Sequence, residues 1–147
     1  LYPLNWLFLW TDPPKQVAYS IGLHIWLAGA GAYLFARSRL NLSLLSASLG
    51  GVIFGFSGFL GAQVEHINQL QGLAWLPWFL LAVGYSKPDG QRNLLRTTLL
   101  IAGLFCLQLL AGHTQTTFIT AVALLIWIIF DWLGRWLLGG GRGLGGL

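Results

Sequence analysis

The segment 14–37, with the sequence PKQVAYSIGLHIWLAGAGAYLFAR, decides the fold class of this chain. Between Lys15 and Arg37 it carries no Asp, Glu, Lys or Arg. A helix that crosses a bilayer needs about 20 predominantly apolar residues, and this segment is long enough. The helix would be apolar on all sides, whereas a water-facing helix carries a polar stripe. The segment therefore predicts a membrane-spanning helix.

The composition of the whole chain agrees with this class. Hydrophobic residues make up 56% of the 147 residues and charged residues only 8%, against roughly a quarter in soluble domains. So few charges cannot cover the surface of a soluble domain of this size. The formal net charge of +4 comes from basic residues scattered singly between apolar runs. We therefore expect the lipid bilayer as a partner, and no nucleic acid.

Further apolar segments follow along the chain. We expect helices at about 44–60, 70–85, 94–111 and 116–138, and a short interfacial helix at 4–10. Ser43 should cap the N-terminus of the second helix, and Pro77 should kink the third. Gly112 could cap the C-terminus of the fourth helix, and Thr114 could cap the N-terminus of the fifth. Glycines three or four residues apart in 50–61 predict close helix packing. The predicted fold class is all-α, a polytopic transmembrane bundle of about five helices.

The two ends of the chain bear on its domain organisation. The chain starts at Leu1 without Met and without a signal peptide, so we expect a piece of a longer parent polypeptide. Residues 1–138 should form one partial transmembrane domain, and the glycine-rich segment 139–147 a flexible tail. The single cysteine, Cys106, lies in an apolar run and leaves no disulfide or cysteine-based metal site.

The basic residues fall on alternate connections between the predicted helices. Seven of the eight lie in the segments 37–39, 87–96 and 135–142, and Lys15 alone lies in the other set. Cytoplasmic loops are enriched in Lys and Arg. We therefore expect the Arg-rich segments in the cytoplasm and the connections that carry Glu65 and His113 outside.

Polar and ionisable residues gather on the connections predicted to lie outside. They are Asp12, Lys15, Glu65, His66, Asn68, Gln69, His113 and Gln115. Polar side chains near membrane depth are costly and tend to mark binding sites or pathways. We therefore place the candidate site at this end of the bundle.

Each candidate has a functional and a structural interpretation. Glu65 and His66 suit acid–base catalysis, metal binding or orientation of a phosphate, but they also suit a solvated helix junction. His113 either contacts a ligand or bonds an orphan carbonyl of its turn. Lys15 pairs either with a phosphate or with Asp12.

Histidine also occurs inside the first predicted span. His24 is either a functional group or a side chain hydrogen-bonded to a neighbouring helix. No two of the three histidines are four residues apart, and the carboxylates do not cluster, so we expect no metal site. Tyr2 and Trp75 fit an aromatic belt or packing.

Four segments together resemble the YfhO family of bacterial membrane proteins, which is placed among the GT-C-type glycosyltransferases. They are LYPLNWLF at 1–8, HIWLAGAGAYLFAR at 24–37, FGFSGFLGAQVEHINQLQGLAWLPWFLLA at 54–82 and LQLLAGHTQTTF at 107–118. Their order and spacing carry the resemblance, and the tail after about Trp136 has no part in it.

The resemblance implies an enzyme of the bacterial cytoplasmic membrane that transfers a sugar from a polyprenyl-phosphate donor. The acceptor would be a cell-surface glycan or polymer outside the cytoplasm. The implied catalytic candidates are Glu65 and His66, and the implied contacts to the lipid phosphate or sugar are Lys15, Asn68, His113 and Gln115. GT-C enzymes carry a catalytic Asp or Glu in a loop that would precede Leu1, so we expect the chain alone to be inactive.

Two other functions stay open at this point. A lipid-linked sugar flippase or transporter would use Pro77, the glycine-rich helix and His24 as parts of a pathway. It would need a continuous polar path beyond His24 to the Arg-rich side. A non-catalytic scaffold subunit would need none of the candidate residues.

Overall fold

The computed structural model describes residues 2–84 and 91–137. The predicted tail at 139–147 and most of the connection between the predicted helices at 70–85 and 94–111 lie outside the described residues. Within them the structure is helical, without a strand. The elements in order are η1 (Pro3–Phe8), α1 (Pro13–Ser38), α2 (Leu44–Gly55), α3 (Gly58–Ala62), η2 (Gln63–Glu65), α4 (Ile67–Leu73), α5 (Leu76–Gly84), α6 (Gln91–Leu110) and α7 (Thr114–Leu137).

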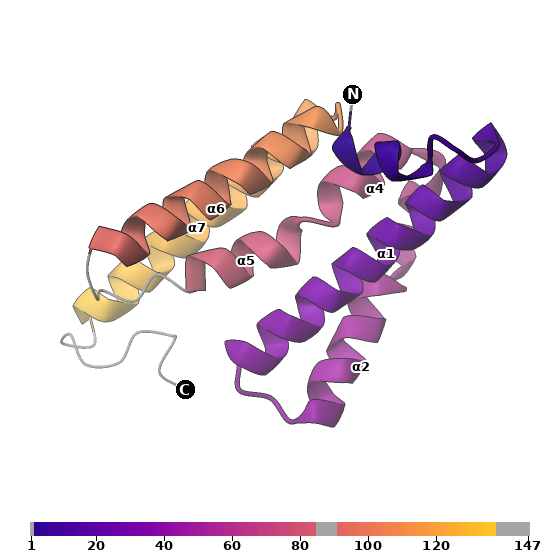
Figure 1. The fold of residues 1–147 in the computed structure, drawn as a ribbon. Coiled ribbons are helices and arrows are strands. Elements are labelled where there is room, and N and C mark those ends of the chain that lie inside the picture. Colours follow the sequence, from indigo (N-terminus) through magenta and orange to yellow (C-terminus); the bar gives the residue numbers. More distant parts are fainter. Residues whose placement is uncertain (1, 85–90, 138–147) are drawn as a thin grey trace.

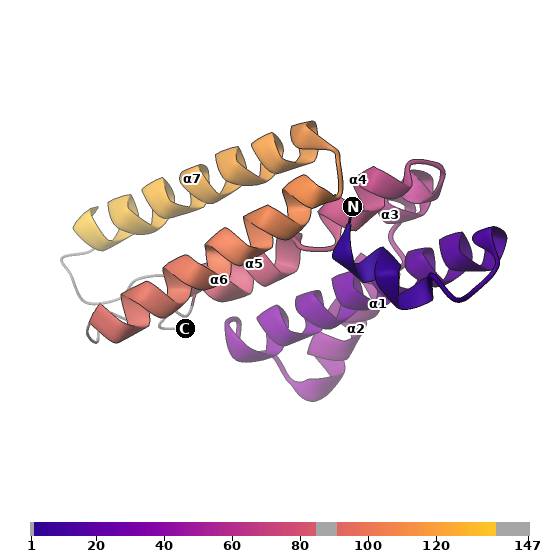
Figure 2. The same ribbon diagram turned by 45° about the horizontal axis from the view of Figure 1, so that its top comes forward.

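Two helical hairpins flank a central helix (Figure 1). The first pairs α1 with α2, the second pairs α6 with α7, and α5 contacts α1 on one side and α6 on the other. Both views place η1, α4 and the α6–α7 connection at one end of the bundle (Figure 2). The α1–α2 connection, next to Arg37 and Arg39, lies at the opposite end. The polar connections singled out in the sequence therefore meet at one end.

Three described helical stretches are long and apolar enough to cross a membrane. They are Pro13–Ser38, Leu44–Glu65 and Thr114–Gly134. The apolar part of α6, Leu94–Leu110, is shorter. The five predicted spans are therefore not all present as long helices, whereas the all-α class and the expectation of membrane-spanning helices agree with the structure.

The third predicted helix, at 70–85, is broken into two short helices. The break lies at Ala74–Trp75 and separates α4, of 7 residues, from α5, of 9 residues. Pro77 has no N–H for the carbonyl one turn back, and its ring crowds that turn, so the helix is interrupted before it. The side chain of Gln108 on α6 donates from Nε2 to the Gly72 carbonyl over 2.9 Å and so satisfies an acceptor near the break.

The second predicted helix is interrupted as well. The α2 helix ends at Gly55, and α3 starts after Ser57, whose Oγ accepts the Leu60 N–H over 3.3 Å. Ser43 caps α2 as predicted, because its Oγ accepts the Ser46 N–H over 3.2 Å. A serine cap inside an apolar run thus starts a new helix two residues after α2 ends.

The predicted glycine packing joins α1 to α2. A Cβ built on Gly51 would lie 2.8 Å from the Gly29 carbonyl oxygen, and one on Gly55 would lie 3.2 Å from the Ile25 carbonyl oxygen. By contrast, a Cβ on Gly50, Gly58 or Gly61 would meet no heavy atom within 4 Å. Two of the five glycines therefore make the close approach.

Candidate functional site

The predicted catalytic pair lies on the surface of the polar end. Glu65 ends η2, and His66 links η2 to α4 with φ −116° and ψ 68°. Asn68 follows on the first turn of α4, and all three side chains are exposed. Their exposure leaves them accessible to a ligand, and it also agrees with the alternative of a solvated helix junction.

His113 joins α4 to the start of α7. The residue is half-buried and is the N-cap of α7, where Nδ1 accepts the Thr116 N–H over 3.3 Å and lies 2.6 Å from Thr116 Oγ1. The amide Nε2 of Gln69 lies 2.9 Å from the other ring nitrogen, Nε2. The predicted cap, Thr114, is wrong, because the imidazole reaches the N–H of the third helical residue and Thr114 is already helical.

Gly112 ends α6 as predicted, with a positive φ of 85° that favours glycine. Gln115, on the first turn of α7, is exposed. His113 thus belongs to a turn motif, as its structural interpretation predicts, but the group that its ring bonds is the Thr116 N–H and not an orphan carbonyl. The turn also brings His113 to the edge of α4.

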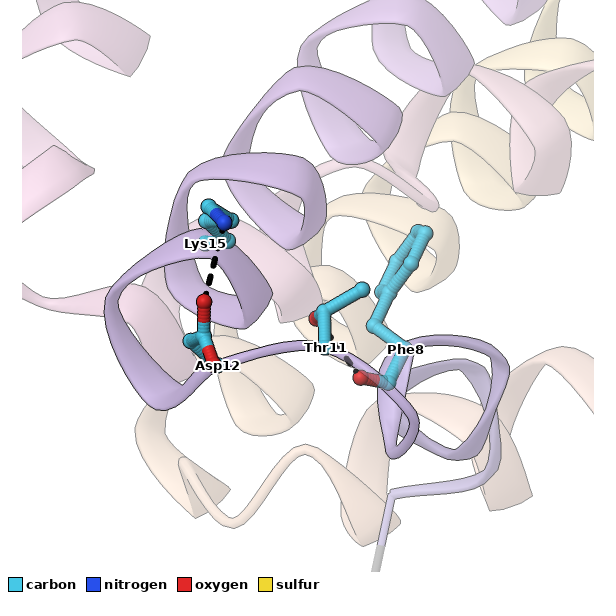
Figure 3. A network of polar contacts seen from close by, with 4 residues as sticks. All are labelled: Phe8, Thr11, Asp12 and Lys15. Atoms are coloured by element: carbon cyan, nitrogen blue, oxygen red, sulfur yellow. Dashed lines mark hydrogen bonds and ion pairs between the residues drawn. The ribbon is translucent and has the colours of Figure 1, made fainter.

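Lys15 pairs with Asp12 at the start of α1. Its Nζ lies 2.9 Å from Asp12 Oδ2, and the two side chains are 63% and 72% exposed. Figure 3 shows this pair beside the bond from Thr11 Oγ1 to the Phe8 carbonyl, of 2.8 Å. Such an exposed pair contributes about 0–1 kcal/mol to stability, so Lys15 can exchange Asp12 for an anionic ligand at little cost.

A buried chain of hydrogen bonds lies directly beneath this end. Trp75 Nε1 donates to the Tyr2 hydroxyl over 3.0 Å, and that hydroxyl lies 2.8 Å from His24 Nε2. The other ring nitrogen, Nδ1, lies 2.6 Å from the Ser20 carbonyl, which can only accept. His24 Nδ1 therefore donates to Ser20, and the Tyr2 hydroxyl, which accepts from Trp75, can donate its proton to Nε2, so both ring nitrogens have partners.

A second set of bonds extends this chain to α4. The Asn5 Oδ1 atom accepts from Ser20 Oγ over 3.0 Å and from Gln71 Nε2 over 2.9 Å. Gln71 Nε2 also donates to Ser20 Oγ over 3.1 Å. His24, Ser20 and Gln71 are all at most 1% exposed. We call Tyr2, Asn5, Ser20, His24, Gln71 and Trp75 the buried polar network.

The sequence predicts only a small part of the buried polar network. It singles out His24, whose structural interpretation as a hydrogen-bonded side chain agrees with its bonds to Tyr2 and Ser20. Ser20 stands four residues earlier and therefore on the same helix face, which is a usable sign. For Asn5 and Gln71 the only sign is an amide inside an apolar run, and no periodicity links them.

Burial sets the electrostatics of the network. Tyr2 is 3% exposed, and loss of water around its hydroxyl raises its pKa to about 12, against a partly offsetting bond from Trp75. The Tyr2 hydroxyl thus stays protonated, as its role as donor to His24 requires. Within the described residues, no three His, Cys, Asp or Glu side chains gather as metal ligands would.

Comparison of the chain with protein-family models, with curated proteins and with solved structures finds no match.

Proposed function

We propose that this chain is the membrane portion of a GT-C-type glycosyltransferase-like protein that uses a polyprenyl-phosphate-linked sugar. The observation that carries the proposal is the polar end itself. An accessible carboxylate, Glu65, adjoins His66, and Asn68 and His113 lie on the neighbouring turns of α4 and α7, directly above apolar helices. The YfhO-like segments of the sequence supply the reaction class.

Sugar transfer from a lipid phosphate places two demands on such a site. The acceptor hydroxyl needs a carboxylate base, and the departing phosphate needs hydrogen-bond donors or positive charge. Glu65 can meet the first demand. His66 and Lys15 can meet the second, and His113 can do so if it exchanges its contact with Gln69 for the phosphate. Asn68 and Gln115 can orient the sugar through their amides. On this proposal the polar end faces outwards from the bacterial cytoplasmic membrane, as the Arg distribution predicts.

The transporter alternative finds less support. Beyond His24, the buried residues of α1 are Ala28, Gly31 and Ala36. His24 itself has both ring nitrogens engaged within the protein. The described residues therefore offer no polar path down α1 toward the Arg-rich end.

The proposal is tested by binding rather than by turnover, because binding of the lipid phosphate does not depend on which sugar or acceptor is used. The protein in lipid nanodiscs is titrated with undecaprenyl phosphate and, as the matched ligand, with undecaprenol, which lacks the phosphate. Intrinsic Trp fluorescence reports binding. We expect the phosphate to bind at least about tenfold more tightly, since one charge-assisted hydrogen bond contributes about 1.5–3 kcal/mol.

Single substitutions test which side chains contact the phosphate. His66→Ala and His113→Ala should each weaken binding several-fold, and the neighbouring Val64→Ala should not. Glu65→Gln should not weaken binding, because it removes a negative charge near the phosphate. Equal affinity for the two lipids would refute the proposal.

A further inference from the structure

The short helix α4, which carries the candidate site, is fastened on opposite sides by two of its own amides. Gln71 donates to Asn5 of η1 and Ser20 of α1, whereas Gln69 contacts His113 at the start of α7. Seven residues make barely two turns, which are too few to be stable alone. The contacts of α4 with the neighbouring elements therefore set its position.

The Gln71 side of this fastening depends on η1. Both Tyr2 and Asn5 belong to the η1 region, and they supply partners for His24, Ser20 and Gln71. The other face of this segment is apolar and exposed at Trp6, Leu7, Leu9 and Trp10. A segment with an exposed apolar face thus completes the hydrogen bonds of buried side chains on α1 and α4.

We propose that Gln71 is a positioning residue, which couples η1 to α4 and thereby holds His66 and Asn68 in the geometry that binds the lipid phosphate. This inference rests on the proposed function for its ligand. The coupling itself rests only on the bonds from Gln71 to Asn5 and Ser20.

The physical argument is the cost of a broken network in apolar surroundings. Gln71 and Ser20 are each 1% exposed, and Asn5 is half-buried. If its amide is removed, one acceptor site on Asn5 and one on Ser20 lose their donor, and no water replaces it cheaply. Of the hydrogen bonds described for α4, those of Gln69 and Gly72 on the α6–α7 side then remain, together with the apolar packing of Leu70 against Ala28 of α1.

The test compares Gln71→Leu, which keeps the size and removes the amide, with Asn5→Ala and with the double variant. The protein in nanodiscs is titrated with undecaprenyl phosphate, and amide hydrogen exchange is measured over residues 67–73. Each single variant should weaken binding about five- to tenfold and speed exchange in α4. Because both variants remove the shared bond between Gln71 and Asn5, the double variant should weaken binding by less than the product of the two single effects.

Two further variants separate positioning from stability. Gly51→Ala places a Cβ 2.8 Å from the Gly29 carbonyl oxygen at the contact between α1 and α2, and it should lower the melting temperature without changing α4 exchange. The double variant Gln71→Asn with Asn5→Gln exchanges the lengths of the two amide side chains. It should bind undecaprenyl phosphate more tightly than Gln71→Asn alone.

The outcomes distinguish the two proposals. If Gln71→Leu lowers the melting temperature but leaves both phosphate affinity and α4 exchange unchanged, the positioning role is wrong and the proposed function stands. If the unaltered protein does not distinguish undecaprenyl phosphate from undecaprenol, the proposed function fails. In that case faster α4 exchange in Gln71→Leu still reports the coupling, and unchanged exchange overturns it too.

Discussion

Gly51→Ala is expected to destabilise the bundle, whereas Gly50→Ala at the preceding position is not. A Cβ at Gly51 would lie 2.8 Å from the Gly29 carbonyl oxygen and 3.0 Å from Tyr33 Cβ, while a Cβ at Gly50 would meet no heavy atom within 4 Å. Both positions lie within α2, so both substitutions gain a similar helix propensity of about 1 kcal/mol. The two variants therefore differ chiefly in the steric contact with α1.

That contact is hard to relieve. The obstacle at Gly51 is a backbone oxygen, which cannot rotate away as a side chain can, so the two helices must separate. Overpacking of a well-packed interior costs about 1–3 kcal/mol. We expect Gly50→Ala to raise the free energy of unfolding by up to about 1 kcal/mol. The free energy of unfolding of Gly51→Ala should be lower than that of Gly50→Ala by about 1–3 kcal/mol.

The difference can be measured by reversible unfolding in mixed micelles. Increasing fractions of sodium dodecyl sulfate unfold the protein, and far-UV circular dichroism and Trp fluorescence follow the transition. Coincident transitions by the two probes justify a free energy for each variant. Equal unfolding free energies for the two variants would refute the close backbone contact between α1 and α2.

Three more predictions follow from the hydrogen bonds and charges. Tyr2 has a folded-state pKa raised from 10.0 to about 12, so the stability that its protonated form contributes is complete below pH 10 and is lost between pH 10 and 12. The free energy of unfolding should fall by about 3 kcal/mol over this range. Tyr2→Phe has no hydroxyl to ionise and should not show this fall. His113→Ala removes the cap of α7 and should cost about 0.5–2 kcal/mol in chemical unfolding, with exposed Gln115→Ala as the neutral control; equal losses would contradict the cap. Lys15→Ala should change the free energy of unfolding by less than about 1 kcal/mol, because its partner Asp12 is exposed, and a larger loss would show that the pair contributes more than its exposure allows.

The sequence predicts those helices and caps that depend only on residues close to one another in the chain. The first span is expected at 14–37 and found at Pro13–Ser38, because prolines start it and an apolar stretch free of charges sustains it. Ser43 and Gly112 act where predicted, since a serine cap and a left-handed glycine need only their own neighbours. Apolar length and cap chemistry together therefore predict the main helices.

The parts that the sequence does not predict depend on contacts between distant segments. Pro77 predicts a kink, but the break at Ala74–Trp75 also involves the Gln108 amide, which comes from another helix. The bond between Gln71 and Asn5 joins residues 66 positions apart, and no period in the chain links them. The polar end was predicted as a group of connections, but its arrangement on α4 was not.

The two kinds of contact also differ in when they can form during synthesis. The glycine contacts of α1 and α2 join neighbouring segments, so this hairpin can assemble as soon as both have left the ribosome. The α4 helix needs η1, which precedes it in the chain, and His113, which lies 44 residues beyond Gln69. The candidate site is therefore among the last parts of the described chain to take shape, and early arrest of translation would leave the hairpin of α1 and α2 without it.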